Sequence, residues 1–420
     1  MVMGTSHRRR VVVTGLGIVA PNGIGKEQFW DSLIAGRSAT KSITLFDAST
    51  YPCRVAGEIC SFKPEDFMRP ARTKHRGRFS QFAVAAAKLA VRDAGLDLKK
   101  IGGDRVRICM GTSMAGIGDV AEGARLGFAR AGYGAIPMVS GLEFAAHAPV
   151  AHVSAELGIQ GQALTLGSAC TTGVDAVHWA STQISDGYAD VALAGATDAP
   201  LAELAYATLS ALGILTRFEG SPSEACRPYD LHRDGMVLGE GAAVLVLEEL
   251  DHAVARGAFL CAEVSGYGHG NEGGYGPRTD AAEKALTHAI ASALVEARLS
   301  PRDIDYINAH GNGLPDYDLV ETRAFKEALG PQAYSTPVSS IKSMIGHAMG
   351  AASAMQVVAS CLALQHCIIP PTINLKHPDP ECDLDYVRGN ARAARVRRVL
   401  INAHAMGGTH TVLIVSAPPL

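Results

Sequence analysis

Short runs of β-branched residues alternate along this chain with longer, alanine-rich segments of helical periodicity. The short apolar runs predict buried strands, and the longer segments predict helices with a buried face. Such an alternation predicts an α/β fold in which helices cover largely buried sheets. The expected strands are Val11–Val13, Arg107–Met110, Asp190–Ala194, Ala242–Leu247, Tyr306–Ala309, Val399–Asn402 and Thr411–Val415, and the expected helices are Ser80–Ala94, Thr171–Asp186, Asp280–Ala297 and Met349–Leu364.

The length of the chain indicates more than one folding unit. A single hydrophobic core stops growing beyond about 250–300 residues, and this chain has 420. We expect two similar halves, residues 1–255 and 256–420, that meet near the charged stretch Glu248–Gly257. No short repeat is visible, so any duplication is structural rather than sequential. The 45 glycines indicate tight turns and closely approaching backbones.

Charge and cysteine content exclude several classes of protein. The 38 basic and 41 acidic residues give a net charge of -3, so no basic excess is available for a nucleic acid partner. Nine cysteines form no CxxC pair, and their odd number indicates a reducing cytoplasm rather than a disulfide framework. A membrane span needs about 18 consecutive apolar residues, and the chain has no such run. The best candidate, Ala351–Ile369, predicts a buried helix followed by a strand.

A cysteine stands where an expected strand gives way to an expected helix. The segment Leu164–Gly173 runs from apolar residues through small ones to Cys170 and the helix start. Free N–H groups and the macrodipole at a helix N-terminus favour a thiolate, so we expect a lowered pKa for Cys170. The small neighbours allow a sharp turn that presents the sulfur to a substrate. The alternative is a buried core cysteine.

A histidine follows an expected strand in the second half. His310 precedes a glycine-rich loop, and a helix is expected to begin at Pro315 and to end at Leu329. Asp318 and Glu321 share one face of that helix. A histidine at a strand tip beside a glycine-rich loop is a candidate catalytic group, although many histidines are satisfied structural residues.

Lys342 and His347 lie in a stretch of apolar and small residues. A buried lysine needs a carboxylate partner, and Asp318 and Glu321 are the available candidates. His347 precedes a helix of small residues, which other backbone can approach closely. An exposed lysine at an ordinary helix start is the alternative interpretation.

A glycine pair turns the chain near its C-terminal end. Gly407 and Gly408 separate two expected strands, and free backbone N–H groups at such a corner can bind an oxyanion. With the thiol, the two imidazoles and the ammonium, this corner completes the equipment for acyl transfer through a thioester. The histidine and cysteine spacings match no common zinc set, and no dinucleotide or Walker loop occurs in a suitable setting. We therefore expect neither a metal nor a cofactor.

These motifs, in this order, resemble those of the β-ketoacyl-acyl carrier protein synthases of the thiolase superfamily over nearly the whole chain. The chain is most similar to the ketosynthase (alpha) subunit of bacterial type II polyketide synthases. The resemblance implies a thiolase fold, in which two similar α/β halves pack in five α-β-α-β-α layers. The other segments that carry it are Val12–Gly17, Gly36–Thr40, Ala194–Pro200, Asp234–Ala243 and Asp379–Tyr386.

The resemblance also implies a decarboxylative Claisen condensation that extends an acyl chain from malonyl-acyl carrier protein. Cys170 would carry the acyl chain, with its thioester oxygen held by the backbone N–H groups of Cys170 and Met406. His310 and His347 would bind the malonyl thioester carbonyl and stabilise the enolate left when CO2 departs.

Supporting residues and partners follow from the same resemblance. Lys342, paired with Glu321 and near Asp318, would organise the two histidines electrostatically. An acyl carrier protein would deliver both substrates on its phosphopantetheine arm. The enzyme would be a dimer, formed with itself or with a chain-length factor homologue.

The chain departs from the usual family pattern at several positions. Asn312 and Leu314 stand where the family usually has Thr, and Met406 stands where it usually has a gating Phe. His404 and His410 occupy positions that are commonly Phe or Ser and Asn. Asn312 can still form hydrogen bonds, Leu314 cannot, and Met406 is flexible. These departures bear on substrate choice and gating rather than on the condensation.

Other functions stay open at this point. A non-catalytic chain-length factor resembles this family but lacks the cysteine that Cys170 provides. A degradative thiolase would carry a second cysteine in the glycine corner, where Met406 stands. A fatty-acid elongation ketosynthase of primary metabolism and a cysteine hydrolase that admits water to the acyl-enzyme are also compatible with the motifs.

Overall fold

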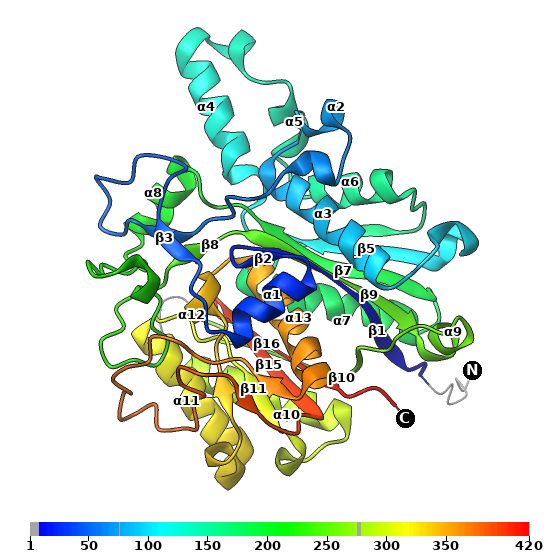
Figure 1. The fold of residues 1–420 in the computed structure, drawn as a ribbon, viewed down its shortest axis with the longest axis vertical. Coiled ribbons are helices and arrows are strands. Elements are labelled where there is room, and N and C mark those ends of the chain that lie inside the picture. Colours follow the sequence, from blue (N-terminus) through cyan, green and yellow to red (C-terminus); the bar gives the residue numbers. More distant parts are fainter. Residues whose placement is uncertain (1–7, 75, 275–278, 420) are drawn as a thin grey trace.

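One large mixed sheet runs through the molecule (Figure 1). The structure, a computed structural model, describes residues 8–74, 76–274 and 279–419. Strands β1 and β10 pair antiparallel over a short register, Val12 with Glu263 and Val13 with Ala262, and this pairing joins two units of the sheet. The strand order in the described residues is β12 (Val338–Ser339), β11 (Tyr306–Asn308), β15 (Arg398–Ala405), β16 (Thr409–Ser416), β10 (Ala262–Asn271), β1 (Val11–Ala20), β9 (Gly241–Glu249), β7 (Val191–Asp198), β5 (Val106–Gly111) and β6 (Ala163–Leu166), with β2 (Gly23–Ile24) paired to β1.

The two units share one topology. In the first, the successive strands β1, β5, β6, β7 and β9 take the spatial order β1-β9-β7-β5-β6. In the second, β10, β11, β12, β15 and β16 take the order β10-β16-β15-β11-β12, which is the same arrangement. The duplication is therefore structural, without a visible sequence repeat. The predicted division at residue 255 falls at the end of α9 (Leu250–Ala255), between β9 and β10.

Helices cover both faces of each unit (Figure 1). The helices α3 (Arg78–Asp93) and α6 (Ala148–Leu157) pack on the outer side of the first unit, and α10 (Thr279–Ala297) and α11 (Pro315–Leu329) on that of the second. Between the units, α7 (Thr172–Ser185) and α13 (Gly350–His366) pack against each other and contact strands of both. The expected five-layered α-β-α-β-α arrangement is confirmed.

Glycines let the outer helices approach the sheet closely. A Cβ on Gly17 of β1 would lie 1.9 Å from the carbonyl oxygen of Ala86 in α3. A Cβ on Gly268 of β10, the equivalent strand of the second unit, would lie 1.8 Å from that of Ala289 in α10. Real Cβ atoms do not approach backbone this closely, so the glycines are required by packing.

The expected strands and helices are all present, with shifted bounds. β1 continues beyond Val13 to Ala20, because a register shift between Val13 and Gly15 lets the strand bend without ending. In the stretch from Glu248 to Gly257, most residues are exposed or half-buried, but its first residue is not. Glu248 is fully buried and forms an ion pair with Arg256.

All nine cysteines are free thiols, and seven are buried. In the part of the chain that the structure describes, no helix combines the length and the apolar character needed to cross a membrane.

The remaining elements surround the sheet. Apart from short 3-10 turns, they are α1 (Lys26–Ile34), α2 (Pro70–Thr73), α4 (Asp119–Ala131), α5 (Val139–Glu143), α8 (Glu203–Ala211), α12 (Lys342–Ile345), β3 (Thr40–Ser42), β4 (Val55–Gly57), β8 (Leu238–Gly239), β13 (Ile368–Ile369) and β14 (Arg392–Ala393).

An arm built on α4 projects from the body of the molecule (Figure 1). The arm and the segment that follows it, through α5, expose a set of large apolar side chains. Contiguous exposed apolar surface marks contact sites on soluble proteins. These side chains are Leu126, Phe128, Tyr133, Met138, Leu142 and Phe144.

Candidate active site

The sharp turn expected at Cys170 is present at the N-terminus of α7. Ala169 adopts a positive φ of 54° and leads into a short 3-10 turn. This conformation is strained for a residue with a Cβ, and such strain clusters at functional sites. Asp175, in the first turn of α7, accepts hydrogen bonds from the hydroxyls of Ser168 and, at 2.9 Å, of Thr171. The residues on both sides of the cysteine are thus tied to the helix.

The thiol of Cys170 is not a thiolate at rest. Its side chain is 4 % exposed, and burial raises the pKa of the thiol to about 12, against a smaller lowering by the positive charge of Lys342. The prediction of a lowered pKa was wrong, because desolvation of the sulfur outweighs the favourable field of the helix terminus. The nucleophile therefore rests as a thiol, and its proton must leave when the sulfur attacks.

A polar group lies beside each nitrogen of the His310 ring. Its Nδ1 accepts a hydrogen bond from the backbone N–H of His404 at 3.4 Å. The amide nitrogen of Asn312 lies 3.2 Å from Nε2, the other ring nitrogen. The Asn312 amide is fixed in turn, because its Oδ1 accepts the backbone N–H of Leu314 at 3.0 Å. With Nδ1 as the acceptor, Nε2 carries the proton, so Nε2–H and the Asn312 amide are two neighbouring donors that do not bond to each other and can share one acceptor.

His347 stands next to His310. The two ring centroids are 5.1 Å apart and the planes are perpendicular. The backbone N–H of His347 donates to the carbonyl of Val237 at 2.8 Å, which joins the loop to β8. Burial, followed by the positive charge of Lys342, lowers the pKa of both histidines well below the usual value. Both imidazoles are therefore neutral at physiological pH and can each donate one N–H.

Lys342 contacts carbonyl oxygens rather than a carboxylate. Its ammonium donates to the carbonyl of His310 at 2.7 Å and to Oε1 of Gln356 at 3.0 Å. The expected direct pairing with Glu321 was wrong, although this carboxylate still acts on the lysine through space. Burial lowers the pKa of Lys342 to about 8, and the negative charge of Glu321 is the largest opposing influence. The lysine is thus charged at neutral pH. Its ammonium lies against the backbone carbonyl of His310, the residue whose imidazole belongs to the site.

Glu321 fastens the strand tip that carries His310. Its carboxylate is fully buried and accepts four hydrogen bonds. Two come from the backbone, from His310 at 3.1 Å and from Gly311 at 2.8 Å. The others come from the hydroxyl of Tyr229 at 2.5 Å and the amide of Asn402 at 2.8 Å. Burial raises the pKa of Glu321 to about 7.

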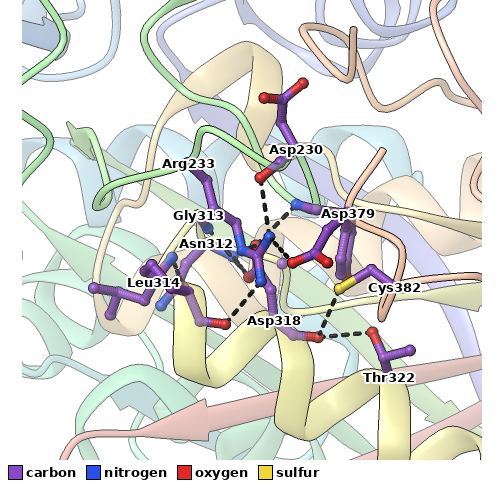
Figure 2. A network of polar contacts seen from close by, with 12 residues as sticks. Asp230, Arg233, Asn312, Gly313, Leu314, Asp318, Thr322, Asp379 and Cys382 are labelled. Carbon is purple, nitrogen blue, oxygen red and sulfur yellow. Dashed lines mark hydrogen bonds and ion pairs between the residues drawn. The ribbon is translucent and has the colours of Figure 1, made fainter. Parts of the chain in front are cut away.

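Asp318 holds the loop that follows. It accepts the backbone N–H groups of Asn312 at 3.1 Å and Gly313 at 3.2 Å. Figure 2 shows Arg233 between this carboxylate and Asp379, with ion-pair distances of 3.3 and 2.7 Å. Burial raises the pKa of Asp318 to about 6, and Arg233 opposes that rise. The buried pair therefore sets the backbone path on which Asn312 sits.

These side chains converge on one pocket formed by both halves of the chain. The turn between β15 and β16 supplies Met406, which is 37 % exposed and stands at the mouth. Five predicted site residues line the pocket together, whereas Lys342, Glu321 and Asp318 lie outside its lining. The lining residues are Cys170, Met236, His310, Asn312, Leu314, Tyr317, His347, His404 and Met406.

Two lining residues and one residue of the framework behind the pocket were not predicted from the sequence. Tyr317 lines the pocket from the first turn of α11, and Met236 lines it from the segment before β8. Neither gave a signal of its own. Arg233 could have been found, because the buried face that carries Asp318 needs a cation.

Comparisons with known proteins identify the class to which this site belongs. The family model described as "Beta-ketoacyl synthase, N-terminal domain" matches residues 8–253, and "Beta-ketoacyl synthase, C-terminal domain" matches residues 261–376. The chain belongs to the β-ketoacyl synthase family, and it is accordingly an acyl-transferring enzyme.

Its relatives specify the branch. The chain is 41 % identical over 427 residues to the "Tetracenomycin polyketide synthase ketoacyl synthase alpha subunit" of Streptomyces glaucescens, covering 99 % of each chain. It matches the solved structure "The ishigamide ketosynthase/chain length factor" with a TM-score of 0.91 and 36 % identity, over 98 % of this chain and 100 % of that one. A type II polyketide synthase acyl carrier protein in complex with its ketosynthase matches with a TM-score of 0.89 and 32 % identity, over 98 % and 100 %. These likenesses confirm the ketosynthase fold that the motifs predicted.

Proposed function

We propose that this chain is the ketosynthase subunit of a type II polyketide synthase and condenses an acyl thioester on Cys170 with malonyl-acyl carrier protein. The observation that carries the proposal is the convergence of Cys170, His310 and His347 on one pocket. The presence of the thiol separates this chain from a chain-length-determining partner, which needs no nucleophile.

In the first step, the sulfur of Cys170 attacks the acyl thioester on the phosphopantetheine arm. A new carbon–sulfur bond forms, the bond to the arm breaks, and the thiol proton passes to the departing sulfur. This transfer is required because burial keeps Cys170 protonated at rest. The oxyanion formed on the way would be held by the backbone N–H groups of Cys170 and Met406, from two segments that reach the same pocket.

In the second step, the malonyl thioester occupies the histidine side of the pocket. The Nε2–H of His310, the neighbouring amide of Asn312 and one N–H of His347 are donors that can converge on its carbonyl oxygen. CO2 leaves, and the electron pair of the broken bond becomes the enolate. The positive charge of Lys342, held against the carbonyl of His310, stabilises the enolate through the backbone and through space.

In the third step, the enolate carbon attacks the acyl carbonyl on Cys170. The new carbon–carbon bond forms, the sulfur leaves, and one proton is taken up to restore the thiol. The product is the β-ketoacyl chain on the carrier protein. No cofactor of the enzyme's own takes part in this sequence, and we expect it to run in the cytoplasm.

We further propose that the subunit works as a dimer, with itself or with a chain-length factor homologue, and that an acyl carrier protein delivers its substrates. Strand β6 ends the strand order of the described sheet, and an open edge invites pairing with another chain. The apolar arm at α4 and α5 adds a surface suited to burial in such a contact. Two solved relatives are described as a ketosynthase with a chain length factor and as a ketosynthase with an acyl carrier protein.

The test uses Cys170→Ala. This variant is expected to lose covalent loading from radiolabelled acyl-carrier protein, while decarboxylation of malonyl-carrier protein continues because His310 and His347 remain. The matched control is Cys60→Ser, which removes an exposed thiol away from the pocket and must load normally. Loading of the alanine variant at the wild-type level refutes the assignment. Mass spectrometry of chains trapped on Cys170 during synthesis separates a polyketide product from a fatty-acid one.

A further inference from the structure

His404 is a buried side chain to which the fold gives no polar partner. Its ring is 2 % exposed, and neither Nδ1 nor Nε2 has a hydrogen-bond partner among the described residues. Leaving a buried donor or acceptor unpaired costs about 1–3 kcal/mol, and native proteins keep few such groups. An aromatic hydrocarbon ring would fill the same space without that cost. The unpaired ring nitrogens therefore indicate that a polar group of a ligand binds here.

The position of the ring shows where such a ligand lies. His404 lines the pocket that contains Cys170. Its ring centroid is 4.0 Å from that of His310 and 4.9 Å from that of Tyr317. Within the described chain, neither ring nitrogen of His404 has a protein partner, and the backbone N–H of His404 donates to Nδ1 of His310. The side chain is thus packed beside the reacting groups.

The positions of His404 and Met406 indicate which part of the substrate His404 contacts. They are two positions apart where β15 gives way to its turn, and both line the pocket. In the proposed function, the backbone N–H of Met406 holds the oxygen of the thioester on Cys170. The β-carbon is the next position along the acyl chain that can carry an oxygen in a product of this reaction.

We propose that His404 recognises an oxygen on the β-carbon of the acyl chain carried by Cys170, and so selects 3-oxoacyl or 3-hydroxyacyl groups over saturated ones. The inference rests on the proposed function, because it requires an acyl chain on that sulfur. It makes His404 a specificity-determining residue, in addition to the groups that perform the condensation.

The protonation state of the ring suits this recognition. Burial lowers the pKa of His404 well below its usual value, and the nearby His410 and Lys342 lower it further. A neutral imidazole has one N–H and one bare nitrogen. It can donate to a 3-oxo group, or either donate to or accept from a 3-hydroxyl group. A saturated chain leaves both nitrogens unpaired, and sites built for a hydrogen bond discriminate on that ground.

His410 provides a matched control. It faces His404 across the β15–β16 hairpin, with ring centroids 5.6 Å apart. Unlike His404, it lies outside the pocket lining, and its Nε2 is within 2.9 Å of a carboxylate oxygen of Glu272. Removal of this imidazole changes the same hairpin but takes no group from the pocket.

The experiment measures loading of Cys170 by the N-acetylcysteamine thioesters of 3-oxobutyrate, 3-hydroxybutyrate and butyrate, followed by intact-protein mass spectrometry. The wild-type enzyme is expected to load at least one oxygenated chain faster than butyrate. His404→Phe is expected to slow that chain about tenfold, the value of one hydrogen bond, and to change butyrate less than twofold. His404→Gln, which keeps an N–H donor, recovers part of the loss, and His410→Asn keeps the wild-type preference.

The outcomes separate the inference from the proposed function. Equal loading of the three chains by the wild type, or an equal loss on all three in His404→Phe, overturns the role of His404 and leaves the condensing enzyme intact. Failure of the wild type to load any chain on Cys170 overturns the proposed function and the inference with it. Thermal unfolding of each variant, with the glutamine variant as a second probe, separates misfolding from lost recognition.

Discussion

Replacing Glu321 with glutamine tests the polar framework behind the pocket, because it removes one charge without changing the shape of the side chain. Each carboxylate oxygen accepts two hydrogen bonds in the folded protein. One oxygen takes the hydroxyl of Tyr229 and the N–H of Gly311, and the other takes the N–H of His310 and the amide of Asn402. In the variant, an NH2 group replaces one of these oxygens. On the Gly311 side the backbone N–H loses its acceptor while the Tyr229 hydroxyl can turn to accept, and on the other side two donors lose theirs.

The expected loss of stability follows from the donors left unpaired. An unsatisfied buried donor costs about 1–3 kcal/mol, so the one or two donors left unpaired cost about 2–4 kcal/mol. The entropy of unfolding is about 2.1 cal/mol/K per residue, which gives roughly 0.9 kcal/mol/K for a chain of 420 residues. The apparent unfolding midpoint of Glu321→Gln should therefore fall by about 2–4 °C.

The same change acts on Lys342. The charge of Glu321 is the largest influence that keeps the pKa of this buried ammonium up at about 8. Without it the pKa falls, so the ammonium is lost at a lower pH. If decarboxylation needs the protonated lysine, the alkaline limb of its rate profile moves to lower pH in the variant.

Calorimetry and the rate of CO2 release from malonyl-carrier protein between pH 6 and about 9 measure the two effects. Glu327→Gln is the control, because it removes the same charge from an exposed position of α11. An unfolding midpoint within about a degree of the wild type, together with an unmoved alkaline limb, would refute both the hydrogen-bond accounting and the electrostatic link.

Two other predictions test neighbouring groups. Arg233→Met leaves the buried carboxylate of Asp318 without its cation and should lower the free energy of unfolding by about 3–5 kcal/mol at pH 8. The cost should be smaller at pH 5, because burial already raises the pKa of Asp318 to about 6 and the protonated form needs no cation; equal losses in urea unfolding at both pH values contradict this. Lys342→Met should slow malonyl decarboxylation at least about tenfold and abolish the alkaline limb that the wild type shows as the pH rises through about 8. Persistence of that limb in the variant excludes Lys342 as its source.

Local sequence signals were sufficient for elements whose ends are chemically marked. Pro315 and Gly330 bracket α11, and the helix runs from Pro315 to Leu329 as predicted. The same spacing placed Asp318 and Glu321 on its buried face. The hairpin around Gly407 also follows from local composition, since two apolar strands flank a glycine turn. In these cases the residues that define the element also terminate it.

Properties set by burial could not be predicted in this way. The helix terminus at Cys170 argues for a thiolate, but β15, β16 and α13 pack over it and remove the water that a thiolate needs. Likewise, a buried Lys342 argues for a carboxylate partner, but the carbonyl of His310 and the amide of Gln356 fill its coordination instead. Both predictions applied a correct local rule. Dense packing decided the direction of the pKa shift at Cys170 and the hydrogen-bond partners of Lys342.

The division of the site between the two halves explains why the chain departs from a simple duplication. The nucleophile enters from the first half, at the start of α7, and His310, Lys342 and His347 enter from the second, around β11 and the start of α13. The two inner helices must therefore meet closely. A Cβ on Gly173 of α7 would lie 2.3 Å from the backbone nitrogen of Ala354 in α13. The pocket depends on that contact, since any separation of α7 from α13 withdraws the thiol from the imidazoles, whichever acyl chain the subunit carries.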